Sequence, residues 1–252
     1  MNFPEGSFNM SCPVRFSDID AHGRASIQSI FNYLQEAADG HTQKLGITVD
    51  RLLKLNITWV LSRFHLRIQK YPLWRDEVTI VTWPSRMQEM FAIREFQLLD
   101  SQHAVIGEAT SSWMIIDVKE RRPVKFPEMI QSINIASSQR AIDDPFQKLR
   151  LPDSIDYEST FTVRFDDLDM NWHANAARYL TWISESLPFQ LRQTSVLNEL
   201  EISYRAETRY GDSINALVQR TDSNEESYLH LLIRQSDSKE IAIARTCWKP
   251  IE

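Results

Sequence analysis

The sequence is short of cysteine and of long hydrophobic runs, and each shortage excludes a class of protein. Cys12 and Cys247 are the two cysteines among 252 residues, too few for a disulfide framework and at a separation that fits no metal site. Apolar runs such as 113–116 fall far short of the roughly 20 residues that a membrane-spanning helix needs. We therefore expect a folded protein of a reducing compartment with no membrane span.

An excess of positive charge is also missing. The formal net charge is −6 and the isoelectric point is near 5.6, which removes the general attraction on which nucleic-acid binding depends. An acidic partner would need a local basic patch, and the best candidate is the cluster Lys119, Arg121, Arg122 and Lys125. The alternative is a solvated turn, because charge runs are common on surfaces.

What is present is an ordinary globular composition. Hydrophobic residues make up 42% and charged residues 25%, which provides material for a core and excludes a disordered chain. The length allows one large domain or two of about 100 to 130 residues. The first ten residues carry no basic residue and no apolar run follows them, so a secretory or transit signal is not expected. A cytoplasmic protein is the expectation.

The chain contains an internal repeat. The segment Arg15–Asp20 matches Arg164–Asp169 without gaps at an offset of 149 residues, and such self-similarity indicates a duplicated unit. Apolar residues at helical spacing follow each copy. The first helix should begin after Ser26 and end at Gly46, and the second should close near Pro188.

Each predicted helix is followed by strand-like segments and by no further helix of comparable strength. These segments are 60–68, 78–83, 91–99 and 105–117 in the first half, and 197–206, 214–218, 228–233 and 241–248 in the second. A strand, a long helix and an antiparallel meander form a curved sheet wrapped around a helix. We therefore predict an α+β tandem (double) hot-dog fold with repeats at 1–130 and 155–252, joined by a linker at 131–154.

The two repeats differ where chemistry could occur. At the strand-to-helix junction the second repeat gathers Asp169, Asn171 and His173, and Glu207 stands opposite Tyr71 of the first repeat. Asn171 can orient a water or a carbonyl, His173 can transfer a proton near neutral pH, and Glu207 can act as a base or hold the imidazole. Amides at a helix start can stabilise an oxyanion. We interpret these residues as a candidate catalytic set that needs no metal and no cofactor.

Structural explanations compete with this interpretation. Asp and Asn are common caps before helices, and a His at a helix start is often structural. Strand alternation places Glu207 opposite the apolar Leu200, Ile202 and Tyr204. Unless the strand ends or bulges before it, Glu207 should therefore face away from the core.

Several motifs resemble one known family. The segments that carry the resemblance are Asp167–Asn175, Trp182, Glu185–Pro188, Arg24–Ile27, Asn32–Glu36, Trp59–Val60, Tyr71–Trp74 and Ala109–Trp113. They look like the corresponding plant and bacterial segments of acyl-(acyl carrier protein) thioesterases, which end fatty-acid synthesis by releasing the free acid. The resemblance covers nearly the whole chain.

This resemblance implies roles for particular residues. Asp169, Asn171, His173 and Glu207 match the family's catalytic network, and Thr208 replaces a Cys of many plant members. Without that thiol, attack by a water that Glu207 and Asn171 activate is the better hypothesis. The resemblance further implies an acyl carrier protein as partner, a bacterial cytoplasmic location, and an acyl-chain pocket in the first repeat. The candidate pocket residues are Ile27, Ile30, Phe31 and Leu34, although a helical apolar stripe is usually core.

Other functions stay open because hot-dog folds serve several. An acyl-CoA thioesterase, a hydroxyacyl-thioester dehydratase and a non-catalytic acyl-binding protein are the alternatives. The sequence fits a monomer or a homodimer.

Overall fold

The computed structural model describes residues 3–88, 90–221 and 226–251 and divides into two compact units, Met1–Pro145 and Phe146–Glu252. The division falls inside the segment 131–154 that the sequence predicts as a linker. Within the described ranges, no helix has both the length and the hydropathy of a membrane-spanning segment.

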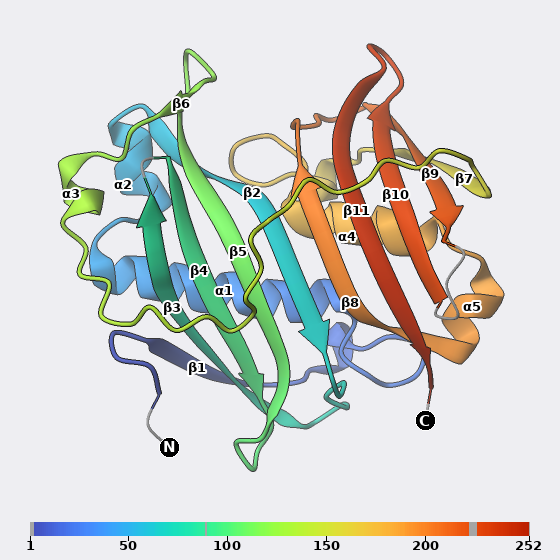
Figure 1. The fold of residues 1–252 in the computed structure, drawn as a ribbon, viewed down its shortest axis with the longest axis horizontal. Coiled ribbons are helices and arrows are strands. Elements are labelled where there is room, and N and C mark those ends of the chain that lie inside the picture. Colours follow the sequence, from blue (N-terminus) through green and yellow to red (C-terminus); the bar gives the residue numbers. More distant parts are fainter. Residues whose placement is uncertain (1–2, 89, 222–225, 252) are drawn as a thin grey trace. The chain divides into compact units, whose positions relative to one another are not determined.

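The first unit is an antiparallel sheet that packs on a long helix (Figure 1). Its elements are β1 Phe8–Pro13, a short 3-10 helix Phe16–Asp18, α1 Ile27–Leu45, α2 Val49–Lys54, β2 Ile57–Ile68, β3 Glu77–Gln88, β4 Phe91–Leu99, β5 Val105–Asp117, β6 Pro123–Val124 and α3 Glu128–Gln131. The strands pair in the order β1-β3-β4-β5-β2, and β6 pairs with β5. The short helices α2 and α3 were not predicted.

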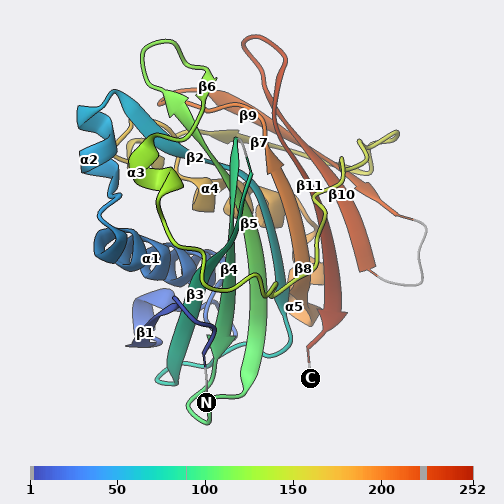
Figure 2. The same cartoon turned by 60° about the vertical axis from the view of Figure 1, so that its left-hand side comes forward.

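Helix α1 has the ends that the sequence predicts. The hydroxyl of Ser26 accepts a hydrogen bond from the amide of Ser29 at 3.1 Å, and Gly46 ends the helix with a φ of 70° that glycine adopts without steric cost. Helix α1 covers one face of the sheet, as the turned view in Figure 2 also shows. Ile30, Phe31 and Leu34 of this helix are buried.

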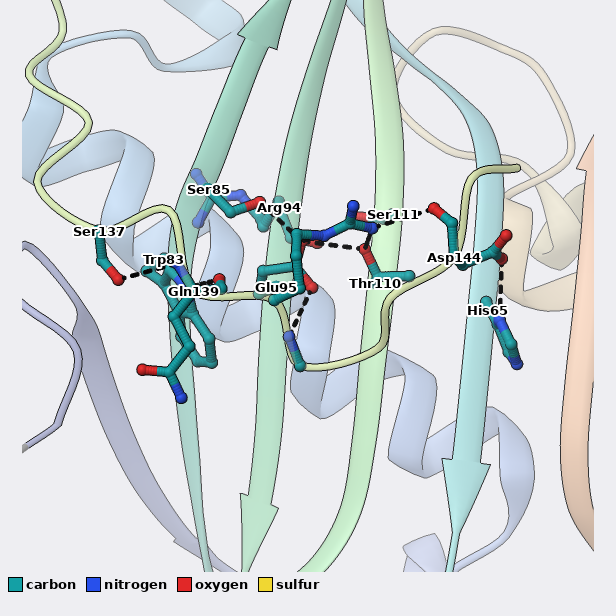
Figure 3. A network of polar contacts seen from close by, with 12 residues as sticks. His65, Trp83, Ser85, Arg94, Glu95, Thr110, Ser111, Ser137, Gln139 and Asp144 are labelled. Atoms are coloured by element: carbon teal, nitrogen blue, oxygen red, sulfur yellow. Dashed lines mark hydrogen bonds and ion pairs between the residues drawn. The ribbon is translucent and has the colours of Figure 1, made fainter. Parts of the chain in front are cut away.

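The opposite face of this sheet is crossed by residues 137–144 (Figure 3). The carboxylate of Glu95, which is fully buried, accepts hydrogen bonds from Arg140 Nε at 2.7 Å, Ser85 Oγ at 2.7 Å and the amide of Ala141 at 3.1 Å. The indole of Trp83 donates to a backbone carbonyl of the same segment. Part of the predicted linker is therefore fixed to the first repeat, because a buried carboxylate must keep these donors.

The second unit repeats the arrangement with a shorter helix. Its elements are β7 Tyr157–Thr162, a 3-10 helix Phe165–Asp167, α4 Ala176–Glu185, α5 Phe189–Thr194, β8 Ser195–Tyr204, β9 Ser213–Arg220, β10 Glu226–Arg234 and β11 Lys239–Pro250. The strands pair in the order β8-β11-β10-β9-β7. Helix α4 ends at Glu185, and Pro188 is the N-cap of the separate α5. Proline excludes helical geometry from the residue before it, which explains the interruption.

The duplication extends to individual backbone hydrogen bonds. The amide of Ala25 donates to the carbonyl of Pro72 at 2.9 Å, and the amide of Ala174 donates to the carbonyl of Thr208 at 2.9 Å. Each bond ties the turn before the long helix to the loop that precedes β3 or β9. Both units therefore carry the predicted hot-dog arrangement, a curved antiparallel sheet with a helix against one face.

Candidate active site

The turn that carries the candidate residues is built around Asp169. Its Oδ1 accepts a hydrogen bond from the amide of Asn171 at 2.7 Å, and its backbone N–H donates to the carbonyl of His173 at 2.8 Å. A side-chain acceptor two residues before the donor is the geometry of an Asx turn. Asp169 thus holds the backbone that presents Asn171 and His173.

The side chains of His173, in the turn before α4, and Glu207, in the loop after β8, meet at a partly exposed place in the second repeat. Nε2 of His173 lies 3.3 Å from Oε2 of Glu207, with side chains 20% and 35% exposed. Strand alternation would turn Glu207 away, but β8 ends at Tyr204, so Glu207 lies in the loop that follows. The distance allows a hydrogen bond between a carboxylate and an imidazole, and the exposure leaves the pair open to a substrate.

Two arginines that the sequence did not single out position Glu207. Arg234, at the end of β10, donates from Nη1 to the backbone carbonyl of Glu207 at 2.9 Å and forms a two-point ion pair with Asp237. Arg209 places Nη2 at 3.7 Å from Oε1 of Glu207. These contacts fix the backbone of Glu207 and place a cation near its carboxylate.

Thr208, which follows Glu207, faces the interior. Its side chain is fully buried, and its Oγ1 lies 3.3 Å from the hydroxyl of Tyr179. Burial raises the pKa of Tyr179 to about 12, so its phenol stays protonated and donates to the carbonyl of Ala206 at 3.1 Å. Thr208 is therefore closed to solvent, whereas the neighbouring Glu207 is partly exposed.

The backbone amides at this junction are already engaged. Those of Trp172, Ala174 and Asn175 donate to the carbonyls of Asp169, Thr208 and Asp167, respectively. The side chain of Asn175 caps α4 by accepting from the amide of Ala177. These three amides are therefore not free to bind an oxyanion.

The first repeat keeps the turn and lacks the pair. Oδ1 of Asp20 accepts from the amides of His22 at 2.8 Å and Arg24 at 3.1 Å, as Asp169 does in the second repeat. Tyr71 occupies the place of Glu207, and burial together with nearby Asp20 raises the pKa of its phenol. A protonated phenol and an arginine cannot act as a base near neutral pH.

The predicted acyl-chain residues belong to the packed core of the first repeat. Ile30 and Phe31 are fully buried, and Leu34 is 1% exposed. The ring of Phe31 meets that of Phe64 edge to face, with centroids 4.9 Å apart. Ile27, at the start of α1, is half-buried.

The predicted partner-binding cluster lies on an exposed turn. Lys119, Arg121, Arg122 and Lys125 are all exposed, between β5 and α3. The carboxylate of Asp117 holds this turn by accepting the amides of Lys119 and Glu120, each at 2.8 Å. Such exposure fits both a docking surface and a solvated turn.

The sequence matches two consecutive family profiles. Residues 5–133 match the acyl-ACP thioesterase N-terminal domain and residues 152–250 match the acyl-ACP thioesterase C-terminal domain, where ACP is acyl carrier protein. The chain belongs to the acyl-ACP thioesterase family. This membership confirms the resemblance that the sequence motifs indicate.

Relatives and solved structures agree with this family. The chain is 31% identical over 256 residues to the chloroplastic acyl-(acyl-carrier-protein) hydrolase FATB1 of Cuphea viscosissima, covering 95% of this chain and 61% of the relative. It spans between 61% and 64% of the length of three such plant relatives.

Two solved structures show the same fold. They are the 12:0-ACP thioesterase from Umbellularia californica, with a TM-score of 0.87, 24% identity and 100% of both chains covered, and an acyl-ACP thioesterase from Bacteroides thetaiotaomicron, with a TM-score of 0.86, 23% identity and 97% and 98% covered. They confirm the predicted tandem hot-dog fold of this acyl-ACP thioesterase family member.

Proposed function

We propose that this chain hydrolyses the thioester of fatty acyl-(acyl carrier protein) and releases a free fatty acid, the step that ends fatty-acid synthesis. The observation that carries the proposal is the 3.3 Å approach of Glu207 to His173 in a partly exposed site, on a chain whose plant relatives are named acyl-ACP hydrolases and thioesterases. The catalytic residues are Asn171, His173 and Glu207, with Asp169 as their positioning residue.

The reaction uses these side chains in order. The carboxylate of Glu207 accepts a proton from a water that the amide of Asn171 orients, and the water oxygen bonds to the thioester carbonyl carbon. The amide of Asn171 and the imidazole of His173 stabilise the resulting oxyanion. When the carbon–sulfur bond breaks, the proton passes through His173 to the leaving thiolate, so the products are a fatty acid and a free thiol. Thr208 takes no part, because it is buried against Tyr179.

The carrier protein is the proposed partner, and the exposed cluster Lys119, Arg121, Arg122 and Lys125 is its proposed docking surface. Four cations on one exposed turn would attract an acidic protein and raise the association rate at low salt. Reversing two of them in Lys119→Glu/Arg122→Glu should raise KM for acyl carrier protein and weaken its salt dependence. A small acyl thioester should react at the wild-type rate.

The acyl chain is proposed to lie in the first repeat, beside Ile27, Ile30, Phe31 and Leu34. These residues form one apolar face of α1, which has the apolar character that an alkyl chain requires. Phe31→Leu should change the distribution of chain lengths among the released acids. Free-fatty-acid profiling of cells that express each variant reads out this change.

The compartment is part of the proposal as well. Several relatives are chloroplastic plant proteins, whereas bacterial structures share the fold. We place this chain in a bacterial cytoplasm, and fractionation of the native cells with an antibody tests that placement.

The decisive experiment compares one acyl chain on two carriers. Hydrolysis of lauroyl and palmitoyl groups on acyl carrier protein and on CoA should give a higher kcat/KM for the carrier protein. Equal or faster turnover of the CoA ester would make the chain an acyl-CoA thioesterase. Enoyl product from a 3-hydroxyacyl thioester, with loss of water and without free acid, would make it a dehydratase. Tight acyl binding without turnover would make it a binding protein.

A further inference from the structure

The catalytic turn contains a large side chain at a position suited to glycine. Trp172 has a φ of 63°, and its amide donates to the carbonyl of Asp169 at 3.0 Å. In the first repeat Gly23 occupies the same place, with a φ of 72° and the same bond to Asp20 at 3.0 Å. Left-handed backbone costs a residue with a side chain about 1 kcal/mol or more. Glycine makes the same turn, so turn formation does not explain the indole.

The indole of Trp172 is part of an exposed aromatic surface. It is 68% exposed and meets the ring of Phe165 edge to face, with centroids 6.2 Å apart. Met170 and Tyr210, in the same turn and in the loop after Glu207, are also 68% exposed. Scattered exposed apolar residues are ordinary, but these lie in the two segments that carry His173 and Glu207, which is where a substrate would bind. We call Phe165 and Trp172 the aromatic platform.

The aromatic platform lies on the side of the site toward which the thiol part of a bound thioester would extend. On the inner side of the pair, Thr208 is fully buried and Tyr179 is 3% exposed. His173 and Glu207 are partly exposed, and Trp172 directly precedes His173 in the chain. A thioester whose carbonyl reaches this pair must therefore extend its thiol side outward across the surface that carries Trp172, since a protein-sized carrier cannot enter.

An exposed positive charge near Glu207 matches the chemistry of that thiol side. The side chain of Arg209 is 63% exposed, and its Nη2 lies 3.7 Å from Glu207. The thiol arm of carrier-bound and CoA-bound acyl groups is a flexible chain of alkyl and amide groups that ends in a phosphate. Amides and methylenes pack on aromatic faces, and a phosphate pairs with an arginine.

We propose that the aromatic platform binds the amide-containing thiol arm of the thioester substrate and sets a preference for substrates with a complete arm. This inference rests on the proposed thioesterase function and adds a specificity-determining surface to it. Phe165 and Trp172 act by holding the arm, whereas the chemistry stays with Asn171, His173 and Glu207.

The test compares one acyl group on the carrier protein with the same group on N-acetylcysteamine, which lacks most of the arm. The measured quantity is the ratio of the two kcat/KM values. Trp172→Gly should lower this ratio about tenfold through KM for the carrier-bound substrate, the effect of losing one large aromatic contact. Trp172→Phe should restore most of it. The free energy of unfolding should not fall in Trp172→Gly, because glycine suits the turn.

Phe16→Ala is the matched control, since Phe16 is the counterpart of Phe165 and contacts Trp74 in the repeat that lacks the pair. Its ratio should equal that of the wild type. An unchanged ratio in Trp172→Gly, or an equal drop in Phe16→Ala, would overturn the inference while leaving the proposed function intact. A wild-type protein that hydrolyses neither substrate would overturn both.

Discussion

Oε2 of Glu207 lies 3.3 Å from Nε2 of His173, although the two residues are separated by a helix, a short helix and a strand in the sequence. The pairing depends on the end of β8 at Tyr204, which frees the following loop to return to the turn before α4. The bond from the amide of Ala174 to the carbonyl of Thr208 fixes that return at 2.9 Å. The first repeat has the same backbone bond, from Ala25 to Pro72, but Arg24 and Tyr71 stand in place of His173 and Glu207. The backbone arrangement therefore does not require the two candidate catalytic side chains.

Asp169 should act through the turn, as Asp20 does in the first repeat. Asp169→Ala and Asp20→Ala each remove an acceptor of backbone amides and should each lower the free energy of unfolding by about 1 kcal/mol. Asp169→Ala alone should lower kcat/KM, by tenfold or more, because Asn171 and His173 lose their placement. Chemical denaturation and steady-state kinetics measure the two effects. Full activity in Asp169→Ala would show that the turn does not position the site.

Thr208 should be dispensable for the chemistry. Thr208→Val keeps the shape of the side chain and removes the hydroxyl that contacts Tyr179. Because that hydroxyl takes no part in the proposed reaction, kcat should fall by less than tenfold. Thr208→Cys should not accumulate an acyl-enzyme, which mass spectrometry of the reacting protein detects. A covalent acyl group on residue 208, or loss of all activity in Thr208→Val, would replace the water mechanism by a nucleophilic one.

The ion pair between Glu95 and Arg140, which fixes residues 137–144 to the first repeat, should contribute strongly to stability. Arg140→Met leaves the buried carboxylate of Glu95 without its cation, and removing one partner of a buried ion pair costs about 3 kcal/mol. Arg150→Met, which breaks an exposed pair with Asp153, should change nothing measurable. Denaturant titration of both variants provides the comparison. Equal midpoints for the two variants would mean that the donors from Ser85, Thr110 and the amide of Ala141 are enough for Glu95.

Acid should destabilise the second repeat through His230. Burial lowers the pKa of this fully buried imidazole from 6.5 to about 3, and its Nε2 lies 2.9 Å from Thr246 Oγ1. Between these pH values the unfolded chain binds a proton that the folded chain excludes, so stability is present above pH 6.5 and falls toward pH 3. In His230→Leu the free energy of unfolding should fall by a few kcal/mol less than in the wild type when the pH is lowered from 6.5 toward 3. Identical pH profiles for the variant and the wild type would contradict the assignment.

The sequence predicts the fold well because its signals are local and occur twice. The cap at Ser26, the stop at Gly46 and the strand segments all depend on neighbouring residues, and the repeat places them in order. Helices α2 and α5 are too short to give a clear helical period. The ion pair between Glu95 and Arg140 joins residues 45 apart in sequence, and no local sequence pattern indicates such a contact.

The sequence predicts part of the candidate site, because the internal repeat shows where the two halves differ. Comparison of the repeats identifies Asn171 and His173, because the first repeat has His22 and Arg24 in their places. The orientation of Glu207 could not be derived from alternation, since that pattern does not reveal that β8 stops at Tyr204. Trp172 could have been noticed from its alignment with Gly23, where a glycine in one copy and a tryptophan in the other indicates a position with positive φ.

The most direct test of the account is steady-state hydrolysis of one acyl-(acyl carrier protein) by single alanine variants at Asn171, His173 and Glu207, beside His22→Ala and Tyr71→Phe as first-repeat controls. We expect kcat/KM to fall by about 10² to 10⁴ in each of the three second-repeat variants, the range of positioned acid–base groups. The two controls should stay within a few-fold of the wild type. Wild-type rates in all three second-repeat variants would contradict the account and place the reaction elsewhere in the protein.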